Sequence, residues 1–134
     1  MIDIKAMIHT RVATRVREAF PGVLVTGRRL LAPETFPAVS VVEVSNVAYE
    51  RTATTDSAEN HARVIYEISI YSNSVVDAES EARAIASVID ATLSGIGFTR
   101  IMLEPIDNAE DAAVFRLVGR YAAVVGTDYT IYRR

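Results

Sequence analysis

Residues 61–72 read HARVIYEISIYS, and this stretch decides the fold. Apolar and polar side chains alternate along it with a period of two, which is typical of a strand with one buried face. The apolar face carries Ala62, Val64, Tyr66, Ile68 and Ile70, and the other face carries His61, Arg63, Glu67 and Ser69. We therefore predict a strand at the centre of a sheet that is covered on one side.

Further strands are predicted on both sides of this stretch. Residues 38–50 are rich in valine, and the Val41–Val42 pair interrupts the alternation, which predicts a bulge there. Residues 98–106 and 112–125 also alternate, and residues 23–26 predict a short edge strand. The polar segments 51–60 and 107–111 connect neighbouring strands as hairpins, so we expect antiparallel pairing.

Two amphipathic helices are predicted. Residues 4–20 place apolar side chains four apart, with Asp3 expected as the N-cap and Pro21 ending the helix. A second helix follows Ser74-Val75-Val76-Asp77, which resembles a capping box. We expect Gly95 to form its left-handed C-terminal cap.

The predicted order is α-β-β-β-α-β-β, an α+β fold in which two helices pack on one face of a single antiparallel or mixed sheet. The chain has 134 residues, which suits one domain. We assign residues 1–126 to this domain. Residues 127–134 are expected to form a C-terminal tail that docks on a neighbouring subunit.

Composition excludes several classes of protein. Hydrophobic residues make up 50% of the chain and charged residues 23%, unlike a disordered protein. The chain has no cysteine, which excludes disulfides, thiolate metal sites and thiol nucleophiles. We expect no membrane span, because no apolar run approaches about 20 residues. We also expect no secretory signal, because Asp3 comes early and no continuous apolar stretch precedes Arg11. Residence in a cytosol is the expectation.

No motif predicts catalysis. The sequence lacks a Gly-x-Ser-x-Gly elbow, a Walker loop and a Gly-x-Gly-x-x-Gly turn. His9 and His61 lack the spacing of a metal pair, and although Asp56, Glu59 and His61 could surround a cation, a solvated loop is the preferred interpretation. We expect no catalytic, cofactor-binding or metal-binding residue, and no enzyme activity.

Charge is distributed unevenly along the chain, whose net charge is -3. Residues 64–112 hold nine acidic and two basic side chains, whereas residues 113–134 hold one acidic and four basic ones. These runs are either solvated faces or complementary patches that meet between subunits.

Candidate interface residues lie in the loop 51–60 and in the C-terminal tail. Tyrosine and arginine often anchor interfaces, because they bury a large area and keep a polar end. The candidates are Arg51, Thr54, Asp56 and Glu59 in the loop, and Tyr129, Tyr132 and Arg134 in the tail.

Four stretches, FPAVS at 36–40, YEISIYSN at 66–73, GFTR at 97–100 and FRLVGRY at 115–121, resemble the tail terminator (tail completion, head-tail joining) proteins of long-tailed phages and prophages. The resemblance extends from Ile4 to about Val125. It implies a homohexameric ring in the neck or upper tail of a virion or phage-tail-like particle, assembled in the bacterial cytoplasm. That ring caps the tail tube, ends its polymerisation and joins it to the head connector.

The same resemblance implies several partners. They are other copies of the chain, the tail tube protein and the head-tail connector, while DNA passes through the lumen without specific binding. We expect the loop 51–60 to contact the tube or the connector, and the tail to contact the adjacent subunit. The acidic segment 64–112 is a candidate lining of the channel.

Two alternatives stay open. The chain is equally compatible with a neck or minor capsid protein of the head-tail module. A monomeric or dimeric adaptor module unrelated to phages could use the same fold and charge.

Overall fold

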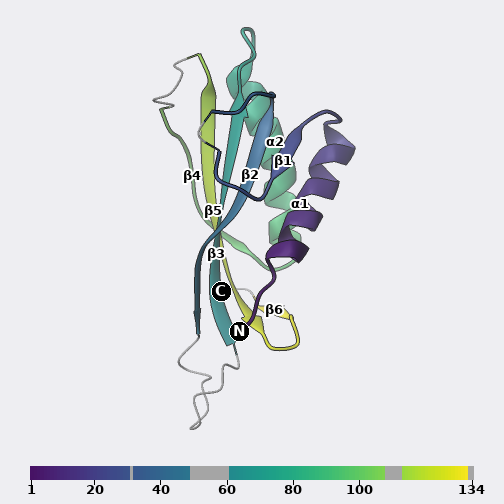
Figure 1. Cartoon of the computed structure of the whole chain (residues 1–134), viewed down its shortest axis with the longest axis vertical. Helices are drawn as coiled ribbons and strands as arrows, with labels where there is room; N and C mark the ends of the chain where they lie inside the picture. The colour runs from purple at the N-terminus through teal and green to yellow at the C-terminus, as the bar shows by residue number, and fades with distance from the viewer. Residues whose placement is uncertain (31, 49–60, 108–112, 133–134) are drawn as a thin grey trace.

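The computed structural model describes residues 1–30, 32–48, 61–107 and 113–132. Two helices cover one face of a single mixed sheet, which confirms the predicted α+β class (Figure 1). The elements in chain order are α1 (Lys5–Ala19), β1 (Leu24–Thr26), β2 (Ala38–Ala48), β3 (His61–Ser72), α2 (Ala78–Gly95), β4 (Thr99–Pro105), β5 (Phe115–Gly126) and β6 (Ile131–Tyr132).

The sheet has the strand order β1-β2-β3-β5-β4, and β6 pairs with β5. All pairs are antiparallel except β1, which runs parallel to β2. β3 pairs over its whole length with β5, from His61 opposite Gly126 to Ser72 opposite Phe115. The helices therefore rest on a sheet whose central strand is held on both edges.

The bulge in β2 differs from the prediction. The register shifts between Glu43 and Ser45, and not at the Val41–Val42 pair. Val41 belongs to the core under the helices, whereas Val42 pairs with Glu67 on the opposite side. The two valines thus keep the alternation, because each face of the sheet accepts an apolar side chain at this point.

The core lies between the helices and the sheet. Both helices contribute aliphatic side chains, and Tyr66 of β3 meets Phe98 edge-on at 5.8 Å between ring centroids. Fully buried core side chains include Ile8, Val12, Val16, Ile68, Ile85, Ile89, Leu93 and Leu117. Burying these apolar surfaces stabilises the packing of both helices on one face.

The helix starts agree in part with the prediction. Ile4 is the N-cap of α1, so Asp3 lies one residue before it, although its carboxylate still accepts the Lys5 N–H at 3.0 Å. Before α2, the Ser74 hydroxyl donates to the Asp77 carboxylate at 2.7 Å and accepts the Asp77 N–H at 3.3 Å. Ser74 and Asp77 therefore bond to each other, but they do not form a capping box, because Asp77 is itself the N-cap of α2 and the Ser74 N–H donates to the Ser72 hydroxyl at 3.4 Å.

The C-terminal cap of α2 is at Gly97, and the prediction of Gly95 was wrong. Gly97 has φ +114°, and its N–H donates to the Ser94 carbonyl at 3.1 Å. The next N–H, from Phe98, donates to the Leu93 carbonyl at 2.9 Å. This bond pattern is a Schellman motif, in which the left-handed residue comes two positions after the last helical one.

A second, smaller cluster forms on the helix-free face of the sheet. Ala38, Tyr71 and Val114 are buried there, and Leu30 and Phe36 of the β1–β2 connection pack against them. The Tyr71 hydroxyl donates to the Leu30 carbonyl at 2.7 Å. This connection covers one end of the helix-free face.

The cap geometry predicts opposite effects for two neighbouring glycines. A Cβ at Gly97 would lie 2.9 Å from Cγ2 of Ile131 in β6, on a backbone already at positive φ. We expect Gly97→Ala to lower the free energy of unfolding by about 2–3 kcal/mol. Gly95 has open space around it, so Gly95→Ala should leave stability unchanged or raise it by about 0.5 kcal/mol. Urea unfolding of both variants checks this, and equal effects would contradict the assignment of the cap.

Two buried tyrosines predict a loss of stability at alkaline pH. Burial and a hydrogen bond to Asp90 raise the pKa of Tyr121 above its usual 10.0, and burial with the charge of Glu43 raises that of Tyr66. A raised pKa in the folded state gives stability that is complete below pH 10 and is lost as the pH rises further. Because each tyrosine ionises in the unfolded chain but stays neutral in the folded one, each should lower the free energy of unfolding by about 1 kcal/mol by pH 11. Denaturant unfolding between pH 8 and 11 should show a shallower decline for Tyr121→Phe than for the unaltered protein.

Candidate interaction surfaces

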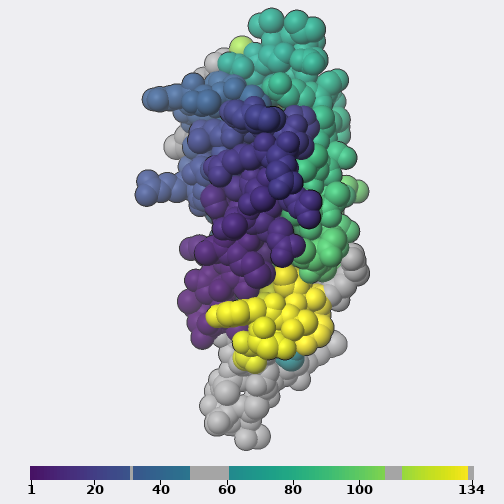
Figure 2. Space-filling model, turned by 90° about the vertical axis from the view of Figure 1, so that its right-hand side faces the viewer, coloured from purple at the N-terminus to yellow at the C-terminus, as the bar shows by residue number. Residues whose placement is uncertain are grey.

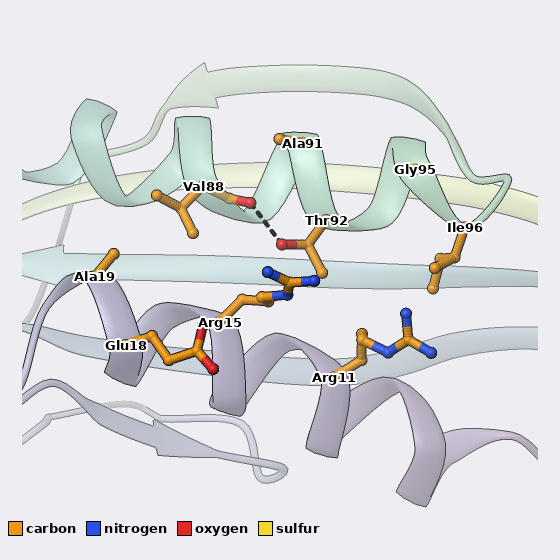
Figure 3. A pocket seen from close by; sticks show the side chains of 9 residues that line it. All are labelled: Arg11, Arg15, Glu18, Ala19, Val88, Ala91, Thr92, Gly95 and Ile96. Atoms are coloured by element: carbon orange, nitrogen blue, oxygen red, sulfur yellow. Dashed lines mark hydrogen bonds between the residues drawn. The ribbon is translucent and has the colours of Figure 1, made fainter.

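A groove of about 600 Å³ runs between α1 and α2 on the helical side of the molecule. Figure 3 shows Arg11 and Arg15 extending from α1 toward α2, where Thr92 bonds to its own helix through the Val88 carbonyl at 2.8 Å. The lining consists of Arg11, Arg15, Glu18, Ala19, Val88, Ala91, Thr92, Gly95 and Ile96. The groove thus combines an apolar floor with two guanidinium groups.

The positive charge of this groove comes from the composition of α1. Residues 5–19 hold four basic side chains and one acidic side chain, Glu18. Arg11 and Arg15 are exposed and one helical turn apart, and neither forms an ion pair within the described part of the chain. Two adjacent cations without a carboxylate partner suit a surface that receives an acidic one.

The helix-free face of the sheet carries a buried carboxylate. Glu67 of β3 is 7% exposed and accepts from Arg120 of β5 at 3.0 Å from Nε and 2.9 Å from Nη2. Arg29, from the β1–β2 connection, lies 3.6 Å away from its other oxygen. Glu67 and Arg120 thus form a cross-strand ion pair, since they face each other in the register.

Two more arginines make this face cationic. The Arg116 guanidinium lies over the ring of Tyr71, 5.5 Å from its centroid. The Nε atoms of Arg63 and Arg116 are buried and have no hydrogen-bond partner among the residues described. Arg120 and Arg29 thus contact the Glu67 carboxylate, while Arg63 and Arg116 lie elsewhere on the same face, which carries more arginines than carboxylates.

The C-terminal residues fold back on their own sheet. In β6, Ile131 pairs with Val125 and packs against the core, and the Tyr132 ring meets His61 at 5.5 Å. Tyr129 sits in the preceding turn with φ 63°. This pairing explains why an apolar residue such as Ile131 occurs so near the end of the sequence.

Tyr129 and Tyr132 keep free surface despite this pairing. They are 55% and 45% exposed, so docking of these rings on an adjacent subunit stays a prediction. The other predicted interface residues, Arg51, Thr54, Asp56, Glu59 and Arg134, lie outside the described residues.

The acidic segment 64–112 does not form one acidic surface. Glu67 lies on the helix-free face, whereas Asp90 lies on α2 and pairs with Arg100 at 3.1 Å. Because these carboxylates occupy opposite sides of the sheet, the segment as a whole cannot line one channel.

Sequence reasoning overlooked an exposed apolar turn. Val75 and Val76 are 99% and 90% exposed in the turn that precedes α2. The signal was present as two β-branched residues inside the polar run SNSVVDAES at 72–80. It was interpreted only as part of a helix cap.

The described residues hold no group of three or more histidine or carboxylate side chains placed to bind a metal ion. No helix among them is long and apolar enough to cross a membrane.

The contacts of Glu67 predict that Arg120 contributes more to the stability of the fold than Arg29 does. Removing the carboxylate by Glu67→Gln leaves the cations unpaired and should lower the free energy of unfolding by about 1–2 kcal/mol. Arg120→Ala should cost about as much, because Arg120 makes two short contacts. Arg29→Ala should cost under about 0.5 kcal/mol, since its longer contact is exposed to solvent. Thermal unfolding of the three variants checks the order, and a larger effect of Arg29→Ala would contradict it.

Comparison with known proteins shows likeness at the level of structure and not of sequence. No family model matches the chain, and no curated protein sequence matches it. Among solved structures, the chain is similar to a chain of the "Virion of native gene transfer agent (GTA) particle", with a TM-score of 0.63 and 15% sequence identity. The likeness covers 89% of this chain and 91% of that one. At this identity the comparison shows that the two chains share a fold.

Proposed function

We propose that this chain is a structural protein of a phage-like particle. In this proposal it forms a homohexameric ring that caps the tail tube, ends tube polymerisation and joins the tube to the head connector. The observation that carries the proposal is the shared fold with a chain of a gene transfer agent virion. Because the likeness spans about nine-tenths of both chains, it concerns the whole domain and not a common supersecondary motif.

The open strand edges favour repeated contacts between copies. Beyond Ser40, β2 pairs only with β3, and on the other side β4 pairs only with β5, within the described residues. Ile101 is exposed at the bulge of β4. Unpaired edges are usually covered by another chain or blunted. Two different edges on opposite sides of one sheet suit a head-to-tail contact, which closes into a ring when its rotation permits.

The separated charges favour the same kind of contact. α1 and the helix-free face are cationic, whereas residues 74–81 hold three carboxylates and no basic side chain. Patches of opposite sign at different places on one subunit meet when copies assemble in a common direction. A self-complementary twofold contact would need both signs within one patch.

The proposed role is structural and not catalytic. The groove between the helices offers guanidinium groups and apolar side chains, which suit contacts between proteins. DNA would pass through the lumen of the ring without specific binding, in keeping with a net charge of -3. The proposed location is the neck or upper tail of a particle assembled in the bacterial cytoplasm.

Native mass spectrometry with negative-stain imaging tests the ring. We expect a hexamer of about 88 kDa, six times the 14.7 kDa chain, with a central hole. Addition to polymerising tail tube protein should stop tube growth and place a ring at one end of each tube. Asparagine tolerates the positive φ at position 129, so Tyr129→Asn removes the aromatic side chain without straining the backbone. If that side chain docks on a neighbouring subunit, the variant should form a less stable hexamer.

Three outcomes would redirect the proposal. A ring that binds the head connector but never tube ends would favour a neck protein. Binding to capsid alone would favour a minor capsid protein. A protein that stays monomeric at all concentrations and leaves tube growth unchanged would support an adaptor module instead.

A further inference from the structure

The turn before α2 presents two valines as a rigid apolar knob. Val75 and Val76 are 99% and 90% exposed, so the chain itself provides them with almost no packing. The Ser74 hydroxyl fixes the turn, because it accepts the N–H groups of Val76 and Asp77 and donates to the Asp77 carboxylate. A turn held in this way loses little conformational freedom when it docks. Exposed apolar groups on an ordered element mark interaction sites.

The knob is surrounded by negative charge. Asp77 follows the valines directly, and Glu79 and Glu81 lie in the first turn of α2. Glu81 is turned inward to the Ser72 hydroxyl at 2.6 Å, and Glu79 pairs with the exposed Arg83. The Glu79–Arg83 pair is solvent-exposed and weak, so both Asp77 and Glu79 can still interact with another cation. A partner surface that offers apolar area for the valines and cations for these carboxylates would therefore be complementary to the knob.

The groove between α1 and α2 offers both. Its lining includes Val88, Ala91 and Ile96 of α2 and its C-terminal turn, and the two guanidinium groups of Arg11 and Arg15 extend from α1 into the space between the helices (Figure 3). Glu18 lies at one end and reduces, without cancelling, the positive charge. α1 and α2 lie side by side on the surface, so the groove is accessible along this face (Figure 2).

The knob cannot reach the groove of its own chain. It precedes α2 at one end of the molecule, whereas the groove follows residues 88–96 in the second half of that helix (Figure 1). The rise of a helix separates Val76 from Thr92 by roughly 20 Å. Any contact between the two surfaces must therefore join different molecules.

We infer that the Val75–Val76 knob of one copy docks in the α1–α2 groove of the next copy. The inference rests on the proposed ring and names the contact that builds it. The valines pack on the apolar floor, and Asp77 and Glu79 face Arg11 and Arg15. The contact joins two different surfaces, so each copy gives one knob and receives another, and the series closes when the ring is complete.

Cross-linking tests the contact directly, since the chain has no cysteine of its own. Val76→Cys and Ala91→Cys are introduced together and treated with a short bis-maleimide reagent. We expect intermolecular cross-links to form at least about tenfold faster than with Val76→Cys and Glu34→Cys, because docking raises the effective concentration. Equal rates in the two variants would overturn the inference, whether or not rings are present.

Mixing two defective variants tests the direction of the contact. Val75→Ser/Val76→Ser removes the apolar side chains of the knob and leaves the groove intact. Arg11→Glu/Arg15→Glu reverses the charge of the groove and leaves the knob intact. Each alone should lose the ring. Mixed, they should form heterodimers that grow no further, because only one contact is then possible.

Two matched variants control for changes in net charge. Lys5→Glu/Arg17→Glu changes the charge of α1 by the same amount outside the groove and should keep the ring. Asp77→Lys/Glu79→Lys should abolish the ring alone and restore it when combined with Arg11→Glu/Arg15→Glu. Loss of the ring in the Lys5→Glu/Arg17→Glu control to the same extent would contradict a specific contact.

The two proposals fail in distinguishable ways. Rings that persist in all groove and knob variants overturn this inference and leave the proposed ring standing. Selective cross-linking without rings supports the knob and groove and overturns the hexamer. Absence of both rings and selective cross-links overturns both.

Discussion

The fold depends on β3 being enclosed on every side. Both edges of this strand are paired, with β2 and with β5, and Tyr66–Ser72 is buried on both faces of the sheet. A shift of one residue would move its apolar side chains away from the helices and place Glu67 among them, far from Arg120. The two faces therefore fix the register together, one by apolar burial and the other by an ion pair.

The burial of β3 also explains which strands could be predicted from the sequence and which could not. The alternation at residues 61–72 predicted β3 with its observed bounds, because a buried face leaves a local pattern of period two. The parallel pairing of β1 and the return of β6 onto β5 leave no such pattern, since these strands have only three and two residues, too few to show an alternation. Gly97 was misjudged for a related reason: its cap is defined by bonds to Ser94 and Leu93, and either nearby glycine could have ended the helix.

The interaction surfaces were harder to predict than the fold. The uneven charge was visible in the sequence, but the sequence does not show that Arg15 of α1 lies opposite Thr92 of α2. The groove exists only after two helices pack on the same face of the sheet. The exposed valines were visible as residue types, yet exposure is a property of the folded chain. Local sequence thus predicts the helices and strands, whereas surfaces arise from packing between distant segments.

The side chains of the proposed contact lie largely outside the core. The core between the helices and the sheet determines the fold, while Val75, Val76, Arg11 and Arg15 are exposed, although Ile96 of the groove lining also packs against the core. Surface residues can change partners at little cost to folding, because their substitution removes no core packing. The same separation accounts for a shared fold at 15% identity, since a buried pattern can persist while the outer surfaces diverge. In the proposed ring, a few exposed side chains would therefore select the neighbour, while the shared architecture only presents them.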